Sequence, residues 1–390
     1  MATPLHTLAT LPYEIASQIF QFLDISSLKS CRLINRSLLP AASSTLFSSI
    51  HITTTIASLN HATCITCAPH LSPKVKTFTY HASTLVFGPR GSLDETTGTG
   101  TYTNPADFAA NLARLPGSKS LLERFPGSDA LKLWQEFTAL YAARRDLESH
   151  GYVASRLRGL LKLLPNVATV NLCPVSSDHV YVPGEHIPLL SRVDEECFTD
   201  LLAACADYVG ITALRAERLH WGSFRACDDI SRFCSGLREL DLRIDDQGIG
   251  YPYSYMRREV LEFLGACHDL ERLVLHLGAG ELRLRVRYLA ACFEAMRAVC
   301  GDVLRGVWRR LKRVRLVGFT ASEDELRVFF SGHASSLRNV GLERLQFVGS
   351  DGRYVPVDNV SWRRGSGSVI DSIKLAADKT GYLTFPPPSS

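Results

Sequence analysis

One spacing of apolar residues recurs along the chain: two apolar positions separated by two residues, then a third apolar position two places later. The clearest copies are 237–242 (LRELDL) and 270–275 (LERLVL), and the others are 75–80, 167–172, 311–316, 337–342 and 370–375. A degenerate copy at 214–219 carries Glu217 where an apolar residue is expected. The alternation that closes each copy has the period of two that is typical of a strand with one buried face. We therefore expect one strand in each copy.

Between these copies the apolar residues follow the spacing of a helix. Such stretches are 198–205, 224–233, 260–267, 289–299 and 325–330. One helix and one strand in every ~20–40 residues is typical of a leucine-rich-repeat solenoid. Ordinary βαβ units of a closed α/β domain are the alternative, although their strands usually carry longer apolar runs. The pattern predicts an α/β fold, an irregular leucine-rich-repeat-like solenoid with a parallel sheet.

The first fifty residues follow a different pattern, that of three short helices. A helix is expected to begin near Leu11, with Ile15, Ile19, Phe22 and Leu23 forming an apolar stripe on one face. Residues 24–27 break this helix and cap a second one, and a third segment covers roughly 38–47. Three short helices bury too little apolar surface to be comfortably stable alone. We expect this unit to need a partner, although the same apolar residues could pack against one another or against the end of the solenoid.

The chain divides into four parts on these patterns. Residues 1–10 and the tail 381–390, which ends in Pro-Pro-Pro-Ser-Ser, are expected to be disordered. The helical unit covers 11–52, and the repeat domain covers 53–380. A Gly- and Thr-rich stretch near 88–105 predicts a flexible insertion in that domain. Residues 130–164 are expected to be helical.

Length and composition limit the class of protein. A chain of 390 residues is too long for one ordinary core, and 46% hydrophobic with 21% charged residues is typical of a folded protein. No window reaches the ~18 apolar residues of a membrane span. The first 28 residues lack the Lys or Arg of a secretory signal, so the 11 cysteines are expected to be reduced thiols. We expect a cytoplasmic and/or nuclear protein with no membrane partner.

Residues 11–52 resemble an F-box of the fungal type. The resemblance rests on Leu11-Pro12-Tyr13-Glu14-Ile15 at the start, on 31–36 (CRLINR) at the end of the second helix, and on Leu46-Phe47 near the close. An F-box followed by leucine-rich-type repeats is the layout of many substrate receptors of Skp–cullin–F-box ubiquitin ligases. The match covers about a tenth of the chain.

This resemblance implies a function in protein degradation, without catalysis by the chain itself. The F-box would dock on a Skp-type adaptor that joins a cullin, and the repeats would bind a protein substrate. The residues that would contact the adaptor are Leu11, Pro12, Ile15, Ile19, Leu23 and Leu28. A non-ligase F-box scaffold is the alternative, and an enzyme built on an α/β domain is a third hypothesis.

Positive charge gathers in 305–315, where six of eleven residues are Lys or Arg, in a chain of net charge +4. Strand alternation predicts that Arg313 and Arg315 point outward beside Arg243 and His276 of earlier strands. These side chains could hold an acidic or phosphorylated segment of a substrate. A solvated face balanced by nearby carboxylates is the alternative. Nucleic acid is disfavoured because stacking aromatics other than Trp308 are missing.

Two further kinds of site, a metal site and a catalytic site, have only weak support in the sequence. His61, Cys64, Cys67 and His70 have the residue types of zinc ligands, but four ligands within ten residues strain the geometry and no second Cys-x-x-Cys exists. Cys64 and Cys67 could equally be core residues of a helix that begins near Ile56. Phosphate-loop, nucleophile-elbow and zinc-protease motifs are absent. We predict no metal, no cofactor and no enzymatic activity.

Overall fold

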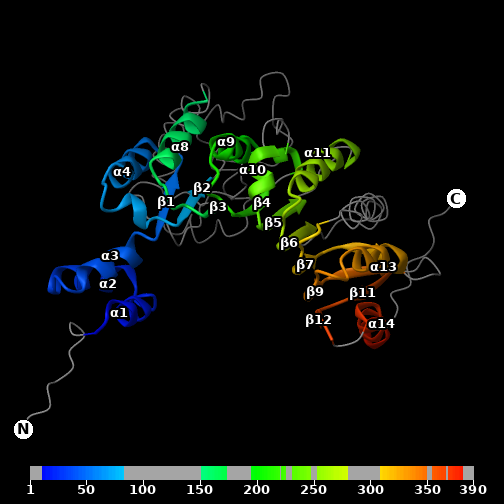
Figure 1. Ribbon diagram of the computed structural model, residues 1–390. Coiled ribbons are helices and arrows are strands. Elements are labelled where there is room, and N and C mark those ends of the chain that lie inside the picture. Colours follow the sequence, from blue (N-terminus) through cyan, green and yellow to red (C-terminus); the bar gives the residue numbers. More distant parts are fainter. Residues whose placement is uncertain are drawn as a thin grey trace, which may run out of the picture.

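The structure is a computed structural model of the 390-residue chain. It describes residues 11–82, 151–173, 195–219, 221–224, 231–246, 253–279, 308–348, 354–365 and 368–380. These residues form an α/β protein built on one large, mostly parallel sheet that does not close into a barrel. The sheet and its helices follow an arch, with three N-terminal helices below one end (Figure 1).

The three N-terminal helices are α1 (Tyr13–Phe20), α2 (Ile25–Ile34) and α3 (Leu39–Leu46). The break between the first two is the predicted one, because the Asp24 carboxylate accepts a 2.7 Å hydrogen bond from the Ser27 amide and so caps α2. Pro40 lies in the first turn of α3, where its missing N–H costs no helical hydrogen bond. The predicted three-helix segment is confirmed.

The large sheet has nine strands that lie side by side in chain order. They are β1 (Ser49–Thr53), β2 (Thr77–His81), β3 (Thr169–Cys173), β4 (Ala213–Leu219), β5 (Glu239–Asp246), β6 (Arg272–Ala279), β7 (Arg313–Val317), β9 (Asn339–Glu343) and β12 (Val360–Arg363). The first eight are parallel, and β12 closes the row antiparallel to β9. Each strand therefore returns beside the strand before it.

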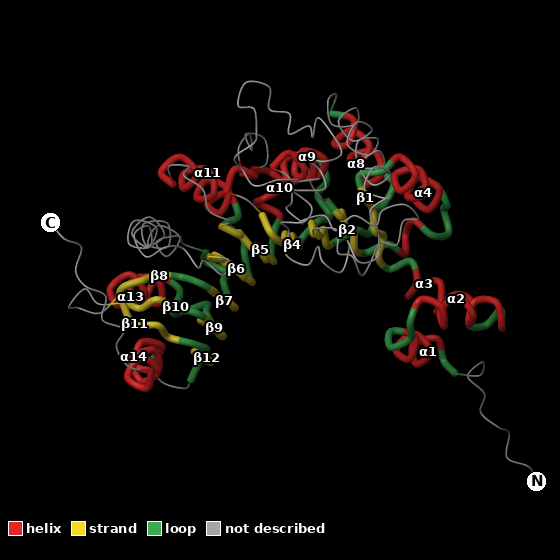
Figure 2. The backbone as a smooth tube through the Cα atoms, turned by 180° about the vertical axis from the view of Figure 1, so that it is seen from behind, coloured by secondary structure: helices red, strands yellow, loops and turns green. Residues whose placement is uncertain are grey.

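Helices cover the outer side of the arch and the strands line its inner side (Figures 1 and 2). These helices are α4 (Ile56–Thr66), α8 (Tyr152–Lys162), α9 (Glu195–Cys205), α10 (Ser231–Gly236), α11 (Tyr253–Ala266), α13 (Glu323–Gly332) and α14 (Val369–Thr380), with 3₁₀ turns at Ser72–Lys74 and Trp221–Phe224. A second, small sheet has the order β11 (Tyr354–Val357), β10 (Leu345–Val348), β8 (Thr320–Ser322). The predicted α/β architecture with a parallel sheet is confirmed at this level.

The recurring apolar spacing builds the core as three parallel rows. The register places Leu240 beside Leu273 and Leu273 beside Val314, while Leu242 and Leu275 pair in the next row. The first apolar residue of each copy forms a third row just before the strands; its members, all at most 3% exposed, are Val75, Val167, Ile211, Leu237, Leu270, Leu311 and Leu337. Each apolar position of one copy therefore packs beside the same position of the next copy, and one core runs the length of the sheet.

A backbone ladder fixes where each strand begins. One carbonyl in front of each strand accepts hydrogen bonds from two consecutive amides of the next copy. Glu271 and Arg272, for example, both donate to the Arg238 carbonyl at 2.7 and 2.9 Å. The other carbonyls of the ladder are those of Ser48, Lys76, Ala168, Thr212, Glu271 and Lys312. The ladder aligns the residues beside these carbonyls along one edge of the sheet.

Two predicted repeat copies were wrong. Residues 370–375 lie in helix α14, where Ile370 and Ile373 are buried and Leu375 is 59% exposed. An apolar pair three residues apart suits a helical face as well as a strand, so the spacing alone was ambiguous. In the copy that contains β4 the apolar positions are Ile211, just before the strand, and Leu214 and Ala216 within it. The copy therefore begins at 211, and Glu217 is exposed.

Several other expectations can be placed. The predicted helices at 198–205 and 325–330 fall within α9 and α13, and the one at 260–267 coincides with the end of α11 except for its last residue. The stretch 224–233 is described only at its ends, by a 3₁₀ turn and the start of α10. Residues 49–53, assigned from sequence largely to the three-helix unit, form β1 and pair with β2.

Some expectations fall outside the described residues. They are the disordered ends 1–10 and 381–390, the flexible insertion near 88–105, the helix at 289–299, and all of the helical stretch 130–164 before Gly151. Within the part of the chain that is described, no helix is both long and apolar enough to cross a membrane.

Candidate protein-binding surfaces

The three N-terminal helices have a small core of their own, separate from the core of the sheet. Its members are Ala16, Phe20, Leu28, Leu38, Ala41 and Ala42, with Leu23, Cys31 and Leu46 packed partly against them. Three of the six buried residues are alanines, so little apolar area is buried here. A unit with so small a core gains much from a partner that covers its surface.

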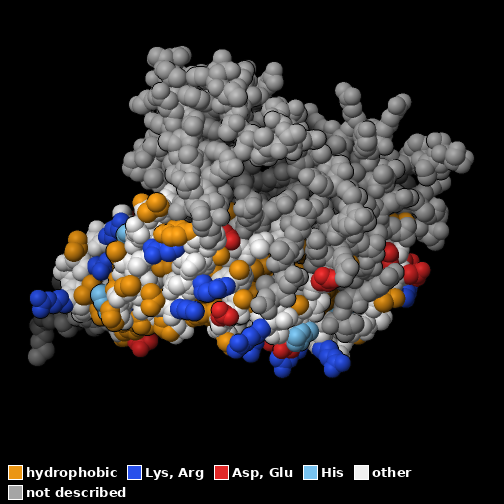
Figure 3. Space-filling view, turned by 90° about the horizontal axis from the view of Figure 1, so that it is seen from above, with side chains coloured by type: hydrophobic (Ala, Val, Ile, Leu, Met, Phe, Trp, Pro, Cys, Tyr) orange, Lys and Arg blue, Asp and Glu red, His pale blue; other side chains and the backbone are white. Residues whose placement is uncertain are grey.

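The same helices expose an unusual number of large apolar side chains. Eight of the fourteen exposed large hydrophobic residues found in the described part of the chain lie between Tyr13 and Leu39. Phe22 is 89% exposed, Leu33 88%, Ile34 76% and Ile25 64%. In Figure 3 hydrophobic side chains (orange) gather over the N-terminal end of the molecule. Concentrated exposed apolar residues are typical of a protein-binding surface.

The residues predicted to contact an adaptor fall into three groups. Pro12, Ile15 and Ile19 are exposed, and the last two are spaced four residues apart on α1. Leu11 and Leu23 are half-buried. Leu28 is only 4% exposed and belongs to the small core, where it supports the surface without being part of it. Helix α1 buries Ala16 and Phe20, so the predicted stripe of Ile15 and Ile19 faces outward.

A second candidate surface is the inner face of the arch. It is formed by those side chains of the sheet that point away from the core and the outer helices. Arg243 lies beside His276 in the register, and Arg315 lies on β7, two residues beyond Arg313. Arg243, Arg313 and Arg315 are exposed and alternate with buried residues, as predicted, and His276 is half-buried. Burial, reinforced by the positive charge of Arg243, holds the pKa of His276 below its ordinary value.

Carboxylates balance part of this face. The Arg315 guanidinium donates two 2.8 Å hydrogen bonds to the Glu343 carboxylate, and this contact lowers the pKa of Glu343. The Arg272 guanidinium lies 3.2 Å from the Glu239 carboxylate. These two residues share a row with Arg313, and that row is one nearer the start of the strands than the row of Arg315. Arg243 and His276 share one row of the register, and Arg315 and Arg313 lie in the next two rows toward the start of the strands. The four predicted substrate residues therefore lie on one face but in three rows, and their charge is partly neutralised.

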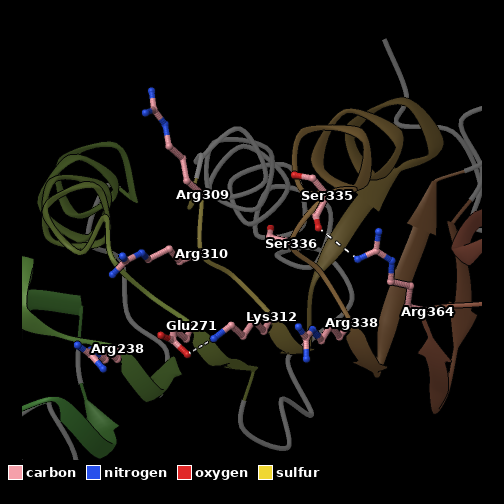
Figure 4. A pocket seen from close by; sticks show the side chains of 9 residues that line it. All are labelled: Arg238, Glu271, Arg309, Arg310, Lys312, Ser335, Ser336, Arg338 and Arg364. Atoms are coloured by element: carbon pink, nitrogen blue, oxygen red, sulfur yellow. Dashed lines mark hydrogen bonds and ion pairs between the residues drawn. The ribbon is translucent and has the colours of Figure 1, made fainter.

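A third candidate surface is a pocket of about 470 Å³ at the edge where the parallel strands begin. Its lining residues are Arg238, Glu271, Arg309, Arg310, Lys312, Ser335, Ser336, Arg338 and Arg364 (Figure 4). Figure 3 shows charged side chains (blue and red) along one edge of the described residues. Sequence reasoning singled out 305–315 as basic but missed this pocket, because its other residues come from four further segments of the chain.

A chain of hydrogen bonds joins side chains of the first three strands. His51 Nδ1 lies 2.9 Å from His81 Nε2, and His81 Nδ1 lies 3.3 Å from the Cys173 Sγ atom. Such a Cys–His arrangement could suggest a nucleophile. However, burial raises the pKa of the Cys173 thiol to about 11, so the thiol keeps its proton at neutral pH. Sequence reasoning missed this cluster, because its members are far apart in the chain and meet only through the register of β1, β2 and β3.

The weighed metal candidate lies on and after α4. The helix begins at Ile56 as expected, but Cys64 and Cys67 are both exposed, so the reading of these thiols as core residues was wrong. By contrast Cys197, Cys205, Cys234 and Cys267 are buried thiols of the main core. A search of the described residues finds no group of three or more His, Cys, Asp or Glu side chains placed to hold a metal ion.

Two comparisons with known proteins gave no match: no family model matches this chain, and neither does any curated protein.

Proposed function

We propose that the protein is a substrate receptor of a Skp–cullin–F-box ubiquitin ligase. Residues 11–52 would be the F-box that docks on a Skp-type adaptor, and the arched sheet with its outer helices would be a leucine-rich-repeat-like domain that binds a protein substrate. The chain itself would perform no chemistry. It would hold the substrate near a ubiquitin-charged enzyme and raise the effective concentration of the two reactants.

One observation carries this proposal: the N-terminal helices expose more large apolar side chains than they bury. Covering a Leu, Ile or Phe side chain contributes about 1.5–3 kcal/mol. Several such side chains in one interface can outweigh the cost of association and give a stable complex. Ile15 and Ile19 present an apolar helix face of the kind that inserts into a partner's groove.

The arrangement of the sheet supports the second half of the proposal. Among the described residues the strands lie in chain order and the helices lie on the outer side, so no described helix covers the inner face, as in repeat proteins that bind partners on a concave surface. On that face the exposed polar side chains of neighbouring strands lie next to one another, which suits recognition of an extended protein segment.

The test is co-purification of the tagged full chain with a Skp-type adaptor and a cullin. We expect wild type to recover both partners and the double variant Ile15→Glu/Ile19→Glu to lose at least about tenfold in adaptor recovery, which corresponds to ~1.4 kcal/mol. Both side chains are exposed, so the variant should keep its fold. Hydrogen exchange of the amides in α1 checks that it does.

The control is Val328→Glu on α13, which adds one negative charge at an exposed apolar position outside the N-terminal helices. We expect this control to recover the adaptor as wild type does. Recovery of the adaptor without the cullin would favour a non-ligase scaffold. A folded wild-type chain that recovers no adaptor would refute the proposal.

A further inference from the structure

The pocket at the starting edge of the strands is strongly cationic. Six Lys or Arg side chains and one carboxylate line it, together with the hydroxyl-bearing Ser335 and Ser336. Its residues differ from Arg243, His276, Arg313 and Arg315 on the inner face, so it constitutes a separate candidate site.

The backbone ladder builds this pocket. Arg238, Glu271, Lys312 and Arg338 each stand directly in front of β5, β6, β7 and β9, and their carbonyls or amides form the ladder. Neighbouring strands lie about 4.8 Å apart, so the side chains beside these carbonyls follow one another at roughly that spacing. Arg364 joins the same edge because β12 runs antiparallel, and its amide donates a 2.8 Å bond to the Arg338 carbonyl.

The cations of the pocket outnumber the groups that could neutralise them. Glu271 is taken by Lys312, whose Nζ lies 2.6 Å from the carboxylate (Figure 4). This bond lowers the pKa of Glu271 and keeps it ionised. Arg310 lies 3.8 Å from the Asp269 carboxylate, outside the lining. The Arg338 guanidinium makes no hydrogen bond or ion pair with any other residue in the described ranges.

Arg364 is held in place at the other side of the pocket. Its guanidinium donates a 3.3 Å hydrogen bond to the Ser335 carbonyl, and Figure 4 shows the side chain reaching toward that residue. The same view shows the Arg309 side chain pointing away from the other side chains of the pocket. The candidate anion-binding groups are therefore Lys312, Arg338 and Arg364.

We propose that this pocket binds a phosphomonoester group. A phosphomonoester carries a charge of about −1.5 to −2 at neutral pH and offers three acceptor oxygens, which matches several guanidinium groups with a serine hydroxyl beside them. A single carboxylate has one charge and two oxygens, and Lys312 already serves one such group. Nucleic acid would need an extended track with stacking aromatics, and no aromatic residue lines the pocket.

The test is a binding assay on the purified full chain without any adaptor, so its result does not depend on the proposed ligase function. The probes are a fluorescent peptide with one phosphoserine, the same peptide unphosphorylated, free O-phosphoserine and inorganic phosphate. We expect the phosphopeptide to bind, free O-phosphoserine and inorganic phosphate to compete, and the Kd to rise with salt. The unphosphorylated peptide should bind at least about tenfold more weakly.

Three variants locate the site. Arg338→Glu should raise the Kd for the phosphopeptide at least about tenfold, or ~1.4 kcal/mol. Glu271→Gln should lower it by about threefold, because it removes the one carboxylate that repels the ligand and occupies Lys312. Arg36→Glu is the matched control, since it makes the same change of charge on an exposed residue of the N-terminal helical unit, outside the pocket and the inner face, and should leave the Kd nearly unchanged.

The comparison of probes also identifies the source of the phosphate. A phosphopeptide that binds about tenfold or more tightly than O-phosphoserine indicates a phosphorylated protein, and equal affinities indicate a free phosphorylated metabolite. Absence of binding would overturn the inference, as would equal effects of Arg338→Glu and Arg36→Glu. Single-stranded RNA that binds more tightly than the phosphopeptide, with the same loss in Arg338→Glu, would assign the pocket to nucleic acid instead.

Discussion

The N-terminal helices and the nine-stranded sheet differ in where they keep their apolar side chains. The helices bury six residues, half of them alanine, and leave Phe22 and Leu33 almost wholly in solvent. The sheet buries nearly every residue of its recurring apolar positions and turns charged residues such as Arg243 and Arg315 outward. The sheet therefore buries most of its apolar side chains within its own core, whereas the N-terminal helices leave most of their large apolar side chains exposed.

This difference teaches how the two regions should respond to change. A small core has few other contacts to replace one that a substitution removes. Truncation of a side chain there should therefore destabilise the three helices strongly without destabilising the sheet. A continuous core shares each loss between neighbouring copies, so damage should spread along the sheet. Three substitutions test whether the two regions respond in these two ways.

The largest local effect is expected from Phe20→Ala. Phe20 is fully buried and is the largest side chain of the small core, so its loss should cost about 3–5 kcal/mol. We expect the amides of 13–46 to lose protection from hydrogen exchange while those of β5 and β6 keep it. Phe22→Ala, which removes the same side chain from an 89% exposed position, is the control and should change little. Loss of protection throughout the sheet in Phe20→Ala would show that the two regions are one cooperative unit.

A slightly smaller loss, distributed differently, is expected from Leu275→Ala. Leu275 is fully buried between Leu242 and Leu316 in the register, and truncation should lower the free energy of unfolding by about 2–5 kcal/mol. Urea unfolding measures the loss, and hydrogen exchange should show weaker protection in β5 and β7 as well as in β6. The exposed Leu375→Ala is the control. An effect confined to β6 would argue against a shared core.

The smallest effect concerns pH and lies entirely within the sheet region. The Trp308 amide donates a 3.0 Å bond to His333 Nε2, and His333 Nδ1 lies 2.7 Å from the Phe329 carbonyl. Burial lowers the pKa of His333 below 6.5. Because the folded pKa lies below the unfolded one, this stabilisation is present above pH 6.5 and is lost as the pH falls through the folded pKa.

The measurement for His333 is urea unfolding of wild type and His333→Gln at several values between about pH 7.5 and about pH 5.5. The variant should be about 1–3 kcal/mol less stable at the upper end, where the buried Trp308 amide loses its acceptor. It should then lose less stability on acidification than wild type. The exposed His268→Gln is the control. Identical pH slopes in all three proteins would contradict the assignment of a neutral His333.

Much of the fold could be predicted because the same spacing of apolar residues recurs in most copies. Copies such as 237–242 and 270–275 combine period-two alternation with an apolar residue in front, and both become strands with the expected faces. The copy at 370–375 failed because its first two apolar residues also satisfy a helix. Strand β1 was missed because Ile50 and Ile52 alone make too short a pattern to stand out from the helices before it.

The candidate sites were less predictable, for two physical reasons. Helix α1 carries apolar residues at 15, 16, 19 and 20, so either of two faces could have turned inward, and only packing against α3 decides that Ala16 and Phe20 are buried. The cationic pocket depends on register, because Arg238, Lys312, Arg338 and Arg364 become neighbours only when each copy starts at the same height. The sequence indicated the positive charge of 305–315 but not which residues from other segments lie beside it.

The paired hydrogen bonds in front of each strand have a consequence for how such a chain can change over generations. The start of each strand is aligned by hydrogen bonds to one carbonyl of the previous copy. This alignment does not depend on the number of residues that connect the two strands. The connection from β2 to β3 covers 82–168 and that from β4 to β5 only 220–238, yet both end in the same two bonds. Insertions can therefore accumulate in the connections and diversify one rim of the molecule without disturbing the alignment of the opposite rim.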